Sequence, residues 1–284
     1  MQLWKDRWCR LGMLAGLILS PALVVIIGCA TVDSDIIHPL PVWEGSVTNV
    51  GAVCIGLQRT AEGVICAGAE KDARQCAARL SAAGVEVTLV LNQEATAEGI
   101  ETVIRAAAGR YDKVIVTWSG HGGLERDEDG DEPDGWDTFL VTYNRHYLDD
   151  EYGRLVQTLP AKVWLLFLTD TCHAEGAWRR TRRGVVQLLT VGLGGRKEPL
   201  IMIRRLESGC AVIQIAGCRK QASSFGTDQD GGVLTSTFWS IGPETKTTHE
   251  AFQATYEASP PWQKPVLTTN EKVRTQFMHG PALR

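Results

Sequence analysis

Short, continuously apolar runs recur along most of the chain and are separated by segments with helical spacing. Such runs, when glycine or polar residues bound them, are typical of strands buried on both faces of a parallel sheet. The predicted strands lie at 50–57, 85–91, 113–118, 163–169 and 209–216. The predicted helices lie at 67–83, 96–108 and 149–159. This alternation predicts an α/β fold in which helices cover both faces of a mostly parallel sheet.

Local signals mark where these helices begin and end. Gly84 and Gly109 directly follow the first two helical segments and are typical C-terminal stops. Thr96 precedes the second segment as a candidate N-cap, and Pro160 ends the third. The helices and strands therefore follow one another closely enough for a single folded domain.

The first 29 residues have the layout of an export signal. Three basic residues precede an apolar stretch over 11–27, which ends at Gly28 and Cys29. The ending IIGC resembles a bacterial lipobox, in which the cysteine is lipidated and becomes the new N-terminus. The alternative is an uncleaved transmembrane anchor, although the stretch falls slightly short of the ~20 residues of a spanning helix. We expect a signal peptide over 1–29, a lipid anchor at Cys29, and an exported protein on the outer membrane facing the periplasm.

Composition adds little to this prediction. Residues 30–49 hold two prolines, one glycine and several small polar residues, which predicts a tether to a folded domain over 50–284. The formal net charge of −4 is small, so the composition does not indicate nucleic acid as a partner.

Five of the eight cysteines lie outside the signal and the motif discussed below, and the sequence assigns no disulfide among them. They are Cys54, Cys66, Cys76, Cys210 and Cys218.

A histidine and a cysteine each come just after a predicted strand. His121 lies in SGHGG at 119–123, and Cys172 lies in DTCHAEG at 170–176. A free thiol has a pKa of about 8.5, so a neighbouring imidazole must take its proton before it can act as a nucleophile at neutral pH. The N–H groups of Gly122 and Cys172 are candidates for an oxyanion hole. Taken singly, His121 would be a turn residue and Cys172 a buried small residue; together at strand ends they indicate a thiol hydrolase.

The two motifs resemble the His and Cys boxes of the caspase/metacaspase cysteine peptidases. Five further segments resemble the family in the same order: AEKDARQCAARLSAAGVEVTLVLNQEAT, GDEPDGWD, LDDE, IAGCRKQAS and QKPVL. The resemblance runs from about residue 50 to about residue 268. It implies a caspase-like three-layer α/β/α sandwich, with His121 as the base and Cys172 as the nucleophile of a cysteine endopeptidase.

The same resemblance implies an acidic specificity pocket. Asp170 and Asp72 match the two pocket carboxylates of metacaspases, and Ser119 is placed with them as a substrate-binding residue. Two carboxylates at strand ends would pair with an Arg or Lys of a protein or peptide substrate. The alternatives are a loop hydrogen-bonder at Asp170 and a helix N-terminal charge at Asp72.

The resemblance also implies calcium as an activator, although the chemistry itself requires no cofactor. Asp137, Asp149 and Asp150 stand at the family's acidic positions, and carboxylate oxygens are the ligands that calcium prefers. The family has a further acidic ligand after the nucleophile, where this chain has Arg179. Two alternatives stay open: the acidic stretch 127–134 binds calcium by itself, or it is a solvated loop.

A basic insertion is predicted at about 176–207, with eight Arg or Lys residues interrupted by glycines. An enzyme that prefers Arg and Lys would find its own cleavage sites there, between 179 and 205; the alternative is a solvated loop drawn to anionic headgroups. Glu175 and Ser224-Phe225 depart from the family's pattern without removing the dyad. Two other functions are considered: a gingipain- or legumain-like peptidase of the same fold, and a caspase-like lipoprotein that binds partners without cleaving them.

Overall fold

The computed structural model describes residues 49–130, 132, 134–175, 187–188, 201–204, 209–270 and 282–283. Two compact units divide the chain, Met1–Leu40 and Pro41–Arg284, and all described residues belong to the second. The predicted signal peptide, Cys29, nearly all of the tether and most of the basic insertion, including Arg179, lie outside the described residues. Within the described ranges, no helix is both long and apolar enough to cross a membrane.

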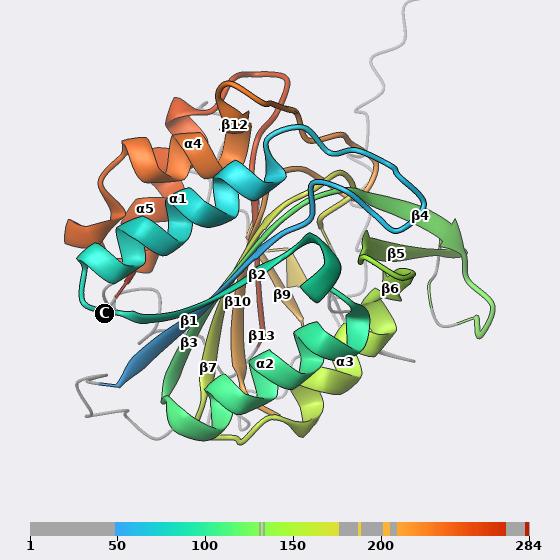
Figure 1. Ribbon diagram of the computed structural model, residues 1–284, viewed down its shortest axis with the longest axis horizontal. Helices are drawn as coiled ribbons and strands as arrows, with labels where there is room; N and C mark the ends of the chain where they lie inside the picture. The colour runs from blue at the N-terminus through green and yellow to red at the C-terminus, as the bar shows by residue number, and fades with distance from the viewer. Residues whose placement is uncertain are drawn as a thin grey trace, which may run out of the picture. The chain divides into compact units, whose positions relative to one another are not determined.

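An eight-stranded sheet forms the centre of the second unit, with the order β2-β1-β3-β7-β10-β13-β9-β8 (Figure 1). Its strands are β1 (Val50–Gly56), β2 (Glu86–Leu91), β3 (Lys113–Ser119), β7 (Trp164–Asp170), β8 (Gln187–Leu188), β9 (Ile201–Arg204), β10 (Ala211–Ala216) and β13 (Val266–Asn270). The five strands from β2 to β10 are parallel, and β13 runs antiparallel to β10. The predicted mostly parallel sheet is confirmed.

Helices cover both faces of this sheet (Figure 1). One face carries α1 (Ala69–Ala82), α4 (Val233–Ser240) and α5 (Thr248–Ala258), and the other carries α2 (Ala97–Arg110) and α3 (Asp149–Thr158). The central strands are mostly apolar because alternate side chains enter two different cores. In β7, Leu165 and Phe167 pack with α2 and α3, whereas Leu166 and Leu168 pack with α1, α4 and α5.

Two small sheets lie outside the central one. The first comprises β4 (Gly122–Arg126), β5 (Trp136–Val141) and β6 (His146–Leu148), and the second comprises β11 (Gly226–Thr227) and β12 (Gly231–Gly232). The acidic sequence LERDEDGDEPDGWD at 124–137 predicts a loop, and this prediction is partly wrong. Its ends belong to the antiparallel pair β4–β5, and only its acidic middle connects the two strands.

Most predicted elements are confirmed to within two residues, and three details differ from the prediction. Helix α1 begins at Ala69 rather than at residue 67, because Gly68 has φ 85° and cannot continue a helix. Helix α2 passes through Gly109 and ends at Arg110, while Thr96 caps its start by accepting a hydrogen bond from Gly99 N at 3.0 Å. The basic insertion contains β8 and β9, which join the edge of the central sheet beside β13.

Candidate active site

The strand register brings the two predicted catalytic residues together. In the parallel pair β3–β7, Ser119 lies opposite Asp170, so His121 and Cys172 each follow the paired strand ends by two residues. A Cβ placed on Gly122 would lie 2.3 Å from the carbonyl oxygen of Cys172. The turn after His121 is therefore in direct contact with the backbone of Cys172, and only glycine permits this approach.

A backbone carbonyl sets the tautomer of His121. Its Nε2 lies 2.9 Å from the carbonyl oxygen of Ile65, in the segment between β1 and α1. Because a carbonyl only accepts hydrogen bonds, Nε2 carries the proton of the neutral ring, and Nδ1 keeps the lone pair. Nδ1 is therefore the atom able to take a proton from a thiol.

Cys172 lies in a tight turn at the end of β7. Its thiol is half-buried, and Sγ lies 3.5 Å from the carbonyl oxygen of Ser224. The next residue, His173, has φ 55°, a strained conformation for a residue other than glycine. Its N–H donates to Ala222 O at 3.0 Å, and its Nδ1 lies 2.5 Å from Lys220 O. The segment after β10 therefore holds the turn that presents the thiol.

The two predicted pocket carboxylates lie just below the dyad. Asp72 comes from α1 and is 1% exposed, and Asp170 ends β7 and is 5% exposed. Ser119 Oγ donates to Asp72 Oδ2 at 2.6 Å, and Gly232 N donates to both oxygens of Asp72 at 3.0 and 2.9 Å. Ser119, Asp72 and Asp170 are thus brought together as the sequence predicted, although their roles stay predictions.

Neutral donors also surround Asp170. Ser224 Oγ donates to Oδ1 at 2.6 Å, and Thr235 N donates to Oδ2 at 2.8 Å. A Cβ on Gly232 would lie 2.2 Å from Asp170 Oδ2 and 3.0 Å from Asp72 Oδ2. The two oxygens are therefore about 5 Å apart at most, within the range in which like charges shift each other's pKa.

Burial dominates the protonation of this pair. Burial, aided by the charge of Asp170, raises the pKa of Asp72 to about 7, against the lowering effect of the hydrogen bonds from Ser119 and Gly232. Burial likewise raises the pKa of Asp170. Within the described part of the chain, neither carboxylate forms an ion pair, since the nearby Lys71 directs its Nζ to the carbonyl oxygen of Gln229. Among the described residues, the pocket thus holds two buried acids and no cation.

Comparisons with known proteins agree with this arrangement. A family model described as the metacaspase, peptidase C14 domain matches residues 52–178. Metacaspase-1 of Schizosaccharomyces pombe is 41% identical over 71 residues, which cover 23% of this chain and 17% of that protein. Metacaspase-1 of Scheffersomyces stipitis is 31% identical over 132 residues, covering 42% and 33% of the two chains. Residues 52–178 of the chain are therefore similar to the peptidase domain of the caspase/metacaspase family.

Solved structures support the caspase-like fold of this chain. Protein GSU0716 from Geobacter sulfurreducens has a TM-score of 0.61 at 22% identity, covering 78% of this chain and 93% of that one. Caspase-1 from Spodoptera frugiperda has a TM-score of 0.53 at 14% identity, covering 78% and 87%. At these identities the likeness shows the fold alone. The chain also spans only a third or less of the length of the two metacaspases.

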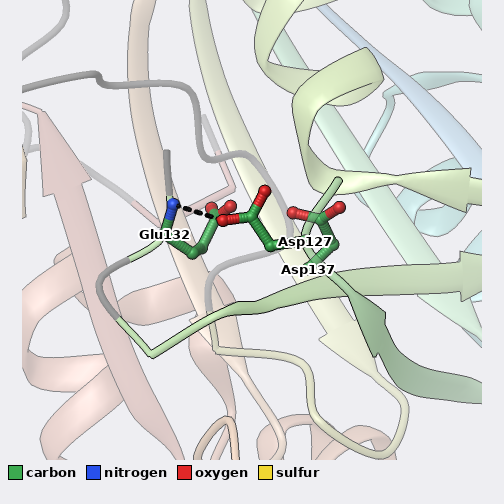
Figure 2. A group of neighbouring side chains, drawn as sticks. All are labelled: Asp127, Glu132 and Asp137. Carbon is green, nitrogen blue, oxygen red and sulfur yellow. Dashed lines mark hydrogen bonds between the residues drawn. The ribbon is translucent and has the colours of Figure 1, made fainter. Parts of the chain in front are cut away.

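The predicted calcium ligands of this metacaspase-like chain fall into two places. Asp137 lies near Asp127 and Glu132, and one carboxylate oxygen from each falls within 4.8 Å of the others (Figure 2). This acidic group, Asp127–Glu132–Asp137, spans the connection between β4 and β5. Asp149 and Asp150 begin α3 and are not members of that group. Three carboxylates suit a hard cation such as calcium, so calcium stays a prediction, with Asp127, Glu132 and Asp137 as its best-grouped ligands.

Sequence reasoning missed several backbone groups and one side chain. The carbonyl of Ile65 and the N–H of Gly232 act through the main chain, so no residue type signals them. Lys220 is the missed side chain: its Nζ donates to Asp134 at 2.8 Å and to the carbonyl oxygen of Trp136. Lys220 therefore links the connection between β4 and β5 to the segment after β10, which in turn holds the turn at Cys172 and His173. The oxyanion roles of Gly122 and Cys172 stay predictions.

Proposed function

We propose that this protein is a cysteine endopeptidase of the metacaspase type that cleaves after Arg or Lys. The observation that carries the proposal is the buried pair Asp72 and Asp170, which has no cation among the described residues and lies directly below the dyad. Two buried like charges are costly unless an opposite charge enters between them. A guanidinium or ammonium group supplies that charge together with several N–H donors.

The dyad supplies the chemistry. Nδ1 of His121 takes the proton of Cys172 Sγ, and the thiolate attacks the carbonyl carbon after the bound basic residue. The N–H groups of Gly122 and Cys172 stabilise the oxyanion that forms. His121 then gives the proton to the leaving amine, and water hydrolyses the acyl-enzyme with His121 again as the base.

The hydrogen bond to Ile65 O supports this sequence. It holds the ring in one tautomer, and it stabilises the ring while Nδ1 carries the additional proton, since Nε2 remains a donor throughout. The carbonyl thus has the part that a carboxylate has in a three-residue catalytic set. A non-catalytic binding role for the protein would not require this arrangement.

Hydrolysis of blocked fluorogenic peptides that differ only in the residue before the cleaved bond tests the proposal. The full chain and its Cys172→Ala variant are compared on Arg, Lys, Asn and Asp peptides, with and without calcium. We expect turnover of the Arg and Lys peptides by the wild type alone. Preference for Asn would favour a legumain-like enzyme, and no turnover together with no labelling of Cys172 by a thiol-reactive peptide would favour a binding protein.

Three further features belong to the proposal. The enzyme is exported and anchored through a lipid on Cys29. Calcium activates it by binding the acidic group Asp127–Glu132–Asp137. The enzyme also cleaves its own chain between residues 179 and 205. The basic residues of that segment, together with the proposed preference for Arg and Lys, support self-cleavage. The wild type should fragment within that segment and Cys172→Ala should stay whole, whereas fragmentation of both would indicate an outside protease.

A further inference from the structure

The acid pair of the pocket has a consequence for how a substrate enters. We propose that Asp72 and Asp170 share one proton in the free enzyme, and that binding of a cationic side chain expels it. The pocket is then a proton-coupled cation site rather than a permanently charged one. This inference rests on the proposed function and deepens it, because it makes recognition of Arg or Lys dependent on pH at the pocket itself.

Geometry is the first support. The two carboxylates are almost fully buried. Asp72 comes from α1 and Asp170 from β7, and both carboxylates lie next to Gly232. Like charges at this separation, about 5 Å at most, disfavour double ionisation in a buried site. The pair titrates as one unit, and the first proton to bind removes the repulsion.

The donors around the pair are the second support. Two hydroxyls and two backbone N–H groups reach the carboxylates, from Ser119, Ser224, Gly232 and Thr235. These four donors are neutral, so they solvate the carboxylates without cancelling the second charge. A proton is the smallest cation that cancels it, and a substrate guanidinium is the cation that replaces the proton.

Other titratable groups near the pair do not supply the missing charge. Burial raises the pKa values of three nearby thiols: to about 12 for Cys66, to about 11 for Cys218, and well above its ordinary value for Cys76. These thiols stay neutral while the pair titrates. Among the described cations, Lys71 lowers the pKa of Asp72.

The remaining charged or titratable groups near the pocket belong to the β11–β12 hairpin and to the dyad. Asp228 and Asp230 lie in the β11–β12 hairpin over the pocket and add negative charge, which favours proton uptake. Cys172 and His121 lie above the pair, so the experiment must separate their protons from those of the pocket. Removing the thiol and comparing variants that keep His121 achieves this.

Calorimetry of peptide binding tests the inference. The protein is the full chain with Cys172→Ala, and the ligand is a blocked peptide with a single Arg, titrated in two buffers with different ionisation enthalpies. The buffer dependence gives the number of protons released. We expect close to one proton released per peptide near pH 6, falling towards none near pH 8.5, with affinity rising up to tenfold per pH unit below about 7 and flattening above.

Matched controls assign the proton. A peptide with citrulline, the neutral isostere of Arg, should bind with no release. Asp72→Asn in the same background keeps His121, so it should lose the release and the pH dependence. Should that variant not fold, Ser119→Ala keeps both acids and removes one hydrogen bond to the charged form, which should move the midpoint of release to higher pH.

The outcomes separate this inference from the proposed function. Arg-peptide binding without proton release between pH 5.5 and 8.5 overturns the shared proton and leaves the Arg/Lys preference intact. Equal release with the citrulline peptide, or undiminished release in Asp72→Asn, also overturns it. Failure of the Arg peptide to bind at any pH overturns both the inference and the proposed function.

Discussion

The molecule gathers carboxylates in two places, and the two are built in different ways. In the pocket, Asp72 comes from α1 and Asp170 from β7, and their donors lie as far as 160 residues away. In the acidic group, Asp127 accepts hydrogen bonds from Asp129 N, Gly130 N and Glu132 N, all within five residues of it. The pocket therefore exists only when the whole domain is folded, whereas the connection between β4 and β5 is shaped mostly by itself.

This difference indicates where function is most sensitive. A site assembled from distant elements cannot relax locally, so a small change in one element displaces the others. A local loop adapts to a substitution or to an ion with little effect on the rest of the domain. We therefore expect large effects in the pocket and small ones in the acidic group.

The largest effect is expected at the nucleophile. Cys172→Ala removes the attacking atom and should lower kcat/KM for Arg peptides by at least about 10³-fold, because no other group in the dyad can form the acyl-enzyme. The thermal midpoint should change little, since the thiol is half-buried. Residual turnover within tenfold of the wild type would assign the nucleophile elsewhere.

Gly232→Ala should have the next largest effect. Gly232 has φ −76°, which alanine adopts freely, so the change is purely one of space. The added methyl would lie 2.2 Å from Asp170 Oδ2 and would force the two carboxylates apart. We expect about a 10²-fold loss in kcat/KM for Arg peptides and a loss of about 1–3 kcal/mol in the free energy of unfolding.

Gly109→Ala is the matched control for that substitution. A Cβ there meets nothing within 4 Å, and Gly109 lies inside α2, where alanine is the better helix former. It should leave activity unchanged and stabilise the protein slightly. Equal losses in the two variants would show that the pocket is not the sensitive region.

The pocket should also make folding depend on pH in an unusual direction. Because the pKa of Asp72 is raised to about 7, the folded state holds a proton that the unfolded state releases above about pH 4. Stability from this group is thus full below pH 4 and declines as pH rises to 7, by as much as roughly 4 kcal/mol. Denaturant unfolding of wild type and Asp72→Asn from pH 4 to 8 measures this effect. The free energy of unfolding of the wild type should fall relative to that of the variant as pH rises from 4 to 7. Plots of the free energy of unfolding against pH that run parallel for the two proteins would contradict the prediction.

The smallest effect is expected in the acidic group. Calcium should raise the thermal midpoint of the full chain by a few degrees through Asp127, Glu132 and Asp137, and Asp137→Asn should abolish the shift. Glu128→Gln, in the same connection but outside the group, should keep it. A shift that survives Asp137→Asn and disappears in Asp149→Asn would move the site to the start of α3.

The sequence predicted the parts of this molecule that chemistry marks by residue type. His121 and Cys172 were predicted as the dyad because a base and a thiol each follow an apolar strand. The alternating elements correctly predicted the sheet and the helices on its two faces. Asp72 was found only through resemblance to a family, since one acid in a helix has no distinctive signal. The antiparallel strand β13 and the edge strands β8 and β9 were missed.

The groups that position the site were missed for a physical reason. The carbonyl of Ile65 lies 56 residues from His121, and the N–H of Gly232 lies 160 residues from Asp72. Both are main-chain atoms, which every residue has, so only the folded backbone shows where they point. The hairpin strands β4 and β5 were missed because the charged residues between them dominate the pattern of that segment.

One measurement tests the central claim most directly: the ratio of kcat/KM for a peptide with Arg before the cleaved bond to that for its citrulline counterpart, in wild type and in Asp72→Asn. The two peptides have the same shape and differ in one charge. If the buried carboxylates select a cation, the ratio should exceed about 10² in the wild type at pH 8 and fall by at least tenfold in the variant. A ratio near one in the wild type, or an unchanged ratio in Asp72→Asn, would contradict an acidic specificity pocket.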